Sequence, residues 1–112
     1  DIFNPAVVRA SQGALFSIQI AVSSPAELGN WLNERKIAIV GAHLKAKKFL
    51  WQANFKRQTA IVVGSEKDGL GDDWNNLLDE TVKIPMNGVS DSMNVNVAAA
   101  LFLYEAMRQQ NT

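Results

Sequence analysis

The sequence contains no cysteine and only one histidine among its 112 residues. The lack of cysteine excludes disulfide bonds, thiolate zinc sites and a cysteine nucleophile, and it agrees with a reducing compartment. One histidine does not build a metal site, so we expect no bound metal. No apolar run approaches the roughly 20 residues that span a bilayer, and no basic segment followed by an apolar one opens the chain. We therefore expect a cytoplasmic protein with neither a membrane span nor a signal peptide.

Acidic residues are missing from one long window of a chain whose net charge is zero. Seven of the 11 basic residues lie in this basic window, from Arg35 to Arg57, together with Phe49, Trp51 and Phe55. Such a mixture suits a nucleic-acid surface, because phosphates need cations and unstacked bases need flat apolar faces. The alternative interpretation is a solvated loop whose aromatic side chains pack inward.

Helical and strand patterns alternate along the chain, which at this length we expect to form one domain with a real core. Strands are predicted over residues 15–22, 37–41, 60–64 and 81–84, and helices over residues 4–13, from Ser24, around Trp74, and from residues 92–94 to Gln109. The most secure helix start is Ser24-Pro25-Ala26-Glu27, a capping box followed by an apolar stripe of Leu28, Trp31 and Leu32. This order predicts an α/β fold with a mainly parallel sheet flanked by helices.

In parallel sheets, ligands bind where strands end and loops lead into helices. Three loops of this kind follow predicted strands: one at Gly41-Ala42-His43, one over residues 64–70 (GSEKDGL) and one over residues 85–92 (PMNGVSDS). None matches the phosphate-binding pattern with Gly, Lys and Ser or Thr, and none is a GxGxxG. ATP-driven chemistry and dinucleotide hydride transfer are therefore disfavoured.

Two of these loops carry a family resemblance. The segments VVGSEKDGL (62–70) and IPMNGVSDSMNVNVAAALFLYE (84–105) resemble, in this order, the second and third motifs of the SpoU/TrmH family, the RNA 2′-O-ribose methyltransferases of the SPOUT superfamily. NPAVVRASQGALF (4–16) is similar to the segment that precedes them, while Met93 stands where Leu is usual. The family's first motif, an Asn-Gly-Arg stretch, would lie upstream of Asp1. Residues 1–112 are then expected to be the C-terminal part of a single SPOUT catalytic domain.

The resemblance implies a C-terminal trefoil knot, S-adenosylmethionine as cofactor, a structured ribosomal or transfer RNA as substrate, and a homodimer. The implied cofactor-binding residues are Ala42, Gly64, Glu66, Ile84, Met86 and Met93. Arg9 is the implied candidate for contacting an RNA phosphate or helping to deprotonate the ribose hydroxyl, with a plain surface arginine as the alternative. Ser92 and Asn94 would position that hydroxyl or the cofactor. Core filling by Met86 and Met93, and capping of the last helix by Ser92 and Asn94, are the structural alternatives. Because the first motif is absent, a non-catalytic module for cofactor binding, RNA binding and dimerisation is the alternative function.

The last predicted helix is apolar on all sides. Val95, Ala98, Ala99, Phe102 and Met107 are assigned to one side, and Val97, Leu101 and Tyr104 to much of the rest. A helix apolar all round must be buried all round. In so small a domain we expect one side to meet the sheet and the other to meet a second subunit.

Overall fold

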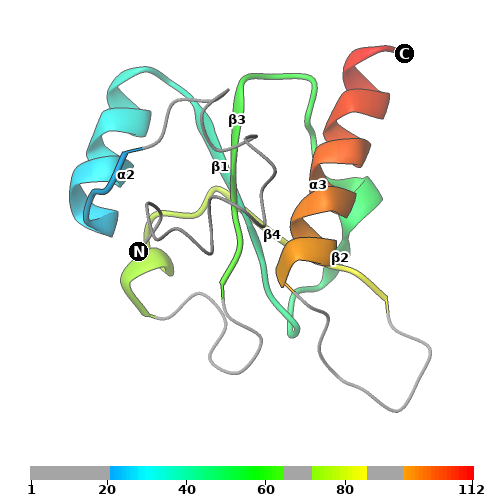
Figure 1. Cartoon of the computed structure of the whole chain (residues 1–112), viewed down its shortest axis with the longest axis horizontal. Coiled ribbons are helices and arrows are strands. Elements are labelled where there is room, and N and C mark those ends of the chain that lie inside the picture. Colours follow the sequence, from blue (N-terminus) through cyan, green and yellow to red (C-terminus); the bar gives the residue numbers. More distant parts are fainter. Residues whose placement is uncertain (1–20, 65–71, 86–94) are drawn as a thin grey trace, which may run out of the picture.

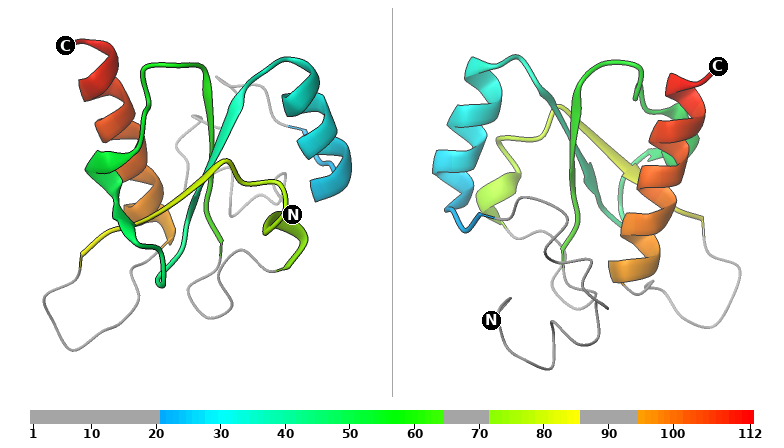
Figure 2. Two further views of the ribbon diagram at one scale, coloured as in Figure 1. Left: turned by 180° about the vertical axis from the view of Figure 1, so that it is seen from behind. Right: turned by 45° about the horizontal axis from the view of Figure 1, so that its top comes forward.

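The structure is a computed structural model that describes residues 21–64, 72–85 and 95–112. A four-stranded parallel sheet lies between two α-helices, which cover its opposite sides in every view (Figure 1, Figure 2). The strands are β1 (Ala38–Ala42), β2 (Lys48–Phe49), β3 (Thr59–Val62) and β4 (Glu80–Lys83), in the spatial order β2-β4-β1-β3. The predicted α/β class with a mainly parallel sheet is confirmed. The path of the expected knot involves residues outside the described ranges.

Helix α2 (Pro25–Glu34) begins as the sequence predicts. The Ser24 hydroxyl accepts a hydrogen bond from the Glu27 N–H at 3.2 Å, and Pro25 occupies the first turn. The predicted apolar stripe is only partly correct, because Leu32 is buried whereas Leu28 and Trp31 are exposed. One contact between this helix and the rest of the domain is made at Gly29, against which the side chain of Leu77 packs.

The predicted strands at 37–41, 60–64 and 81–84 are confirmed as β1, β3 and β4, each within one or two residues of the expected bounds. Of the strand predicted over residues 15–22, only Ala21 and Val22 lie in a described range, and the helix over residues 4–13 lies wholly outside. Ala21 and Val22 are not in a strand, and Val22 is 90% exposed. That end of the prediction is wrong, because the chain turns there into the Ser24 cap.

The helix predicted around Trp74 is also wrong. A 3-10 turn, η3 (Asp72–Trp74), is followed by a turn in which the N–H groups of Leu77 and Leu78 donate to the Trp74 carbonyl, at 2.9 and 3.2 Å. The Asp79 N–H then donates to the Ile39 carbonyl at 2.7 Å, which brings the chain into the sheet. A single turn is all that fits before the chain must join β1.

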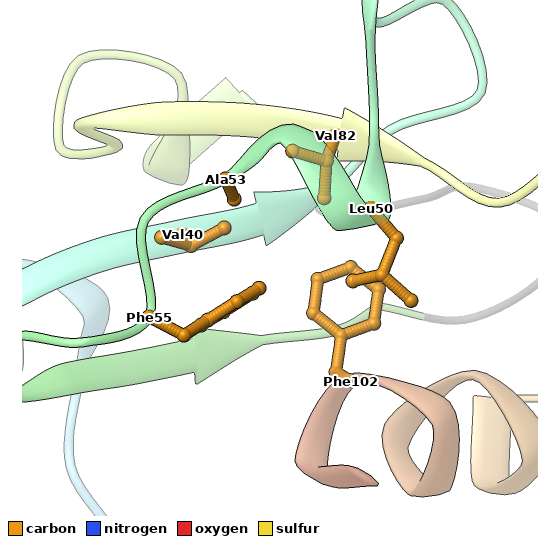
Figure 3. Close-up of a cluster of buried hydrophobic side chains, with 6 residues drawn as sticks. All are labelled: Val40, Leu50, Ala53, Phe55, Val82 and Phe102. Atoms are coloured by element: carbon orange, nitrogen blue, oxygen red, sulfur yellow. The ribbon is translucent and has the colours of Figure 1, made fainter. Parts of the chain in front are cut away.

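Helix α3 (Val95–Gln110) covers one side of the sheet. Its Phe102 is fully buried among side chains of β1, β4 and the segment after β2 (Figure 3). Phe55 meets Phe102 edge to face, with ring centroids 6.3 Å apart. The core cluster consists of Val40, Leu50, Ala53, Phe55, Val82 and Phe102. Four of its members, Val40, Leu50, Ala53 and Phe55, come from the basic window, so the aromatic residues of that window do not all face solvent.

A buried glutamine fastens the end of α3 to the chain before β3. The Gln109 side chain accepts a hydrogen bond from the Phe55 N–H and donates one to the Ala53 carbonyl, both at 2.9 Å. It also donates to Glu105 at 2.7 Å, and Gln110 donates to the Phe55 carbonyl at 3.1 Å. We call these contacts the Gln109 clamp. They satisfy the backbone of a segment that belongs to no strand.

The side of α3 that faces away from the sheet is exposed and apolar. Val97, Leu101, Leu103 and Tyr104 form it, with Tyr104 69% exposed. Met107, which the sequence assigned to the same side as Phe102, is exposed as well. Five residues on, the side chain has turned by about 140°, because an α-helix has 3.6 residues per turn. The expected burial on all sides is therefore not found within this chain: the helix is buried on one side only, and that side also carries the polar Glu105 and Gln109.

Candidate functional site

The carboxyl ends of β1, β3 and β4 lie next to one another at one edge of the sheet. Gly41 of β1 is in register with Val62 of β3, and Ala42 is in register with Val82 of β4. Because all strands run parallel, the chain leaves each of them at this same edge of the sheet. Adjacent strands are about 4.8 Å apart, so groups on three neighbouring strand ends can reach one small ligand.

Three of the predicted cofactor-binding residues lie at this edge: Ala42 ends β1, Gly64 follows β3, and Ile84 follows β4. All three are half-buried. Ala42 and Ile84 pack against the core cluster, so they present a firm apolar wall. None of the three carries an acid or a base. The edge therefore suits binding through apolar contact and backbone groups better than proton transfer by side chains.

The turn after Ala42 holds this strand end in place. The His43 N–H donates to the Val82 carbonyl at 2.9 Å, and the His43 carbonyl accepts from the Ala46 N–H at 3.1 Å. The ring nitrogen Nδ1 of His43 accepts from the Lys45 N–H at 3.1 Å. The single histidine of the chain thus shapes a turn beside the candidate site.

The other predicted site residues lie outside the described ranges. They are Arg9, Glu66, Met86, Ser92, Met93 and Asn94. Their assignment therefore stays a prediction. In the part of the chain that the structure does describe, no group of three or more His, Asp or Glu side chains could hold a metal ion. None of the helices there is long and apolar enough to cross a membrane.

A hollow of about 390 Å³ opens between the start of α2 and η3. Its lining includes Ser24, Asn30, Asp73, Asn76 and Leu77. None of the predicted site residues lines it. We therefore build the candidate site on the strand ends, where three of the predicted cofactor-binding residues lie, and not on this hollow.

The sequence missed the edge strand β2 and the turn η2 (Leu50–Gln52) that follows it. Phe49 of β2 is in register with Lys83, the last residue of β4, so it lies at the same edge as the candidate site. The signal that could have located it is the mixture of aromatic and basic residues in the basic window. The aromatic side chains of that window divide: Phe55 is fully buried, as the solvated-loop interpretation expects, while Trp51 is 54% exposed. The nucleic-acid interpretation of the window stays a prediction.

Glu80 gathers two cations of the basic window. Its carboxylate pairs with Lys48 at 2.9 Å and with Arg57, and it also accepts from the Asn54 N–H. Partial burial raises the pKa of Glu80, but the hydrogen bonds from Lys48 and Asn54 and the charges of Lys48 and Arg57 outweigh it, so the pKa is lowered overall. The ion pairs tie β2 and the segment before β3 to the start of β4.

Comparison with known proteins matches almost the whole chain. The model of the family described as SpoU rRNA Methylase matches residues 1–104. The 23S rRNA (uridine(2479)-2′-O)-methyltransferase of Streptomyces viridochromogenes is 37% identical, over 98% of this chain and 40% of the relative. The 23S rRNA (guanosine-2′-O-)-methyltransferase RlmB of Escherichia coli is 34% identical, over 96% of this chain and 45% of the relative. The chain thus spans less than half the length of these relatives.

Solved structures agree in fold. A crystal structure of an RNA 2′-O ribose methyltransferase superposes on the whole chain and 43% of its own, with a TM-score of 0.93 and 38% identity. The SpoU methyltransferase AviRb from Streptomyces viridochromogenes, in complex with AdoMet, superposes on the whole chain and 44% of its own, with a TM-score of 0.90 and 36% identity. Sequence and fold therefore agree, and the chain belongs to the SpoU rRNA Methylase family.

Proposed function

We propose that this chain forms the cofactor-binding part of an S-adenosylmethionine-dependent RNA 2′-O-ribose methyltransferase acting on ribosomal or transfer RNA. The observation that carries the proposal is the meeting of Ala42, Gly64 and Ile84 at one sheet edge, in a chain of this family. Two relatives of known structure support the choice of cofactor, since AviRb and an rRNA methyltransferase from Sinorhizobium meliloti were both solved with AdoMet.

The residues at this edge fit such a cofactor. Ala42 and Ile84 offer apolar surface for the adenine ring, and Gly64 leaves the backbone open to close approach. The chain leaves the sheet here from three neighbouring strands, and a few placed backbone N–H and C=O groups beside apolar walls are typical of sites that bind small molecules. We assign Glu66, Met86 and Met93 to the same cofactor site.

When bound, S-adenosylmethionine would supply a methyl group on a sulfonium, which is a good leaving group without help from a metal. That chemistry would require the O2′ hydroxyl to be held in line with the methyl group and to lose its proton to water or to a nearby base. The protein must therefore align the hydroxyl and assist its deprotonation. We assign alignment to Ser92 and Asn94, and contact with an RNA phosphate or help with deprotonation to Arg9.

We also propose that the protein is a cytoplasmic homodimer built on α3. The exposed side of this helix is apolar, and its one charged residue in the described part, Arg108, is paired with Glu105 at 2.8 Å. Apolar side chains that are continuous along a helix gain from burial against a second copy. Leu103→Lys should shift the protein toward monomer in sedimentation, while Leu28→Lys on α2 should not. A parent protein that sediments as a monomer would contradict this assembly.

Calorimetry with S-adenosylmethionine, followed by transfer of a radiolabelled methyl group to total RNA, tests the function on the protein in its full natural length. We expect both binding and transfer. Binding of cofactor and RNA without transfer would support the non-catalytic module, and a complete lack of binding heat would contradict the enzyme proposal.

Gly64→Leu should weaken cofactor binding by about tenfold or more, because it adds bulk at the strand ends. Ala26→Leu adds similar bulk at an exposed site on α2 and should leave binding unchanged.

A further inference from the structure

Two aromatic rings of the basic window form a small exposed platform. Phe49 and Trp51 stack with their ring centroids 4.9 Å apart and their planes 21° from parallel. The residue between them, Leu50, is buried in the core cluster, so the two rings are turned to the other side of the chain. Trp51 is the outer ring, with 54% of its surface exposed. We call this pair the aromatic platform.

Cations surround the aromatic platform. The Lys83 ammonium lies over the Phe49 ring, 5.1 Å from its centroid. Lys45 and Lys47, just before β2, are exposed and form no ion pair with any described residue. The one acid near β2, Glu80, is already paired with Lys48 and Arg57. The surface around Trp51 therefore has unpaired positive charge and no free negative charge in the described part of the chain.

The aromatic platform lies at the same sheet edge as the candidate cofactor site. Phe49 is in register with Lys83, one residue before Ile84, while Ala42 lies on the next strand beyond β4. From Phe49 to Ala42 the separation is two strand spacings, or about 10 Å. A polynucleotide with one nucleotide at the strand ends can therefore place another on the aromatic platform.

We propose that the aromatic platform is a single-stranded RNA subsite, where an unpaired base stacks on Trp51 and phosphates contact Lys45 and Lys47. The proposal rests on the function proposed above and adds where its substrate is held. Flat aromatic faces beside unpaired lysines are the chemistry that binds unstacked bases and phosphates. RNA is favoured over a second copy of the chain as the occupant of the aromatic platform. A second copy is better matched by the exposed side of α3, which is apolar and has no free charge.

Fluorescence anisotropy with a labelled, mixed-sequence single-stranded RNA of about 12 nucleotides tests the subsite on the protein in its full natural length. Trp51→Ala should weaken binding about tenfold, and Trp51→Phe should retain most of the affinity because a phenyl ring still stacks. Lys47→Ala should lower the slope of log affinity against log salt by about one. Unchanged affinity of Trp51→Ala would overturn the proposal.

Trp31 provides a matched control. It is also exposed, at 48%, and also meets a cation, with the Arg35 guanidinium 3.9 Å from its ring centroid. It lies on α2, across the sheet from η2 and α3 (Figure 2). Trp31→Ala should therefore leave RNA affinity unchanged. An equal loss in Trp31→Ala and Trp51→Ala would show a general effect and contradict the subsite.

Two further measurements keep the outcomes separate. Calorimetry with S-adenosylmethionine should give the same affinity in Trp51→Ala as in the parent protein. A lack of cofactor binding in the parent protein itself would instead count against the proposed function. A variant with Trp31 and Trp74 changed to Phe leaves Trp51 as the only tryptophan of residues 1–112, and RNA should quench the fluorescence that Trp51 contributes. If RNA leaves that fluorescence unchanged, or if Trp51→Ala turns a dimer into a monomer, the subsite assignment is wrong.

Discussion

Helices α2 and α3 cover opposite sides of one sheet but are attached to it in different ways. Helix α3 buries Phe102 completely and adds two polar side chains, Glu105 and Gln109, each 9% exposed. Helix α2 buries only Gly29 and Leu32, and its start is fixed by the local cap at Ser24. The comparison teaches that α2 depends on hydrogen bonds close in sequence, whereas α3 depends on contacts with residues about fifty positions away.

The largest expected effect is on the α3 side of the core. Phe102→Ala should lower the free energy of unfolding by about 3–5 kcal/mol, because it removes a fully buried ring and leaves a cavity beside Phe55. Urea denaturation measures this loss. Leu28→Ala on α2 is the control and should cost less than about 1 kcal/mol, since Leu28 is partly exposed. Equal losses would remove the distinction between the two helices.

The next largest loss of stability is expected from breaking the Gln109 clamp. Gln109→Ala leaves the Phe55 N–H and the Ala53 carbonyl without their partner and should cost about 2–3 kcal/mol. Gln110→Ala, which loses one bond at the edge of the same clamp, should cost about 0.5–1 kcal/mol. Amide hydrogen exchange at Phe55 should accelerate in the first variant. Slow exchange there after the loss of Gln109 would show that the clamp is not what protects this segment.

On the α2 side, loss of the Ser24 cap should lower the free energy of unfolding by a smaller amount. Ser24→Ala removes the acceptor of the Glu27 N–H and should cost about 1 kcal/mol. Ser23→Ala is the neighbouring control, because the Ser23 hydroxyl only reaches the Ser24 carbonyl and the Glu27 carboxylate at 3.4 Å. It should stay within about 0.5 kcal/mol of the parent protein. The two variants are compared by thermal unfolding under the same conditions.

The smallest expected effect is a dependence of stability on pH through Glu80, which lies beside the segment that the Gln109 clamp holds. The pKa of Glu80 is lowered in the folded protein from its ordinary value of 4.5. Its stabilising contribution is therefore fully present above that value and is lost as the pH falls through the folded pKa. The partners, Lys48 and Arg57, are largely exposed, so solvent screens part of the gain.

Denaturation of Glu80→Gln and of the parent protein at several pH values checks this. The variant should be less stable near neutral pH, and the two curves should converge in acid, where Glu80 of the parent protein is protonated. Curves that stay parallel down to the acid range would show that the Glu80 ion pairs do not stabilise the fold.

The sequence predicted those features that depend on neighbouring residues. The cap at Ser24 and the buried strands β1, β3 and β4 follow from local patterns, and the parallel sheet follows from their alternation with helices. The helix predicted around Trp74 failed, because the need to pair Asp79 with Ile39 overrides the helical spacing of Trp74, Leu77 and Leu78. The strand prediction failed at Ala21 and Val22, because the chain turns there into the cap at Ser24.

By itself the sequence determined the family, the class of fold and three strand-end positions of the candidate site, because motifs and buried strands are written in consecutive residues. Only the tertiary structure decided that Ala42, Gly64 and Ile84 meet, since the order β2-β4-β1-β3 brings together strands that are far apart along the chain. It also separated the aromatic residues of the basic window, sending Phe55 into the core and leaving Trp51 on the surface. Which ring is buried depends on Phe102 and Gln109, about fifty residues further along the chain, and no local pattern contains that information.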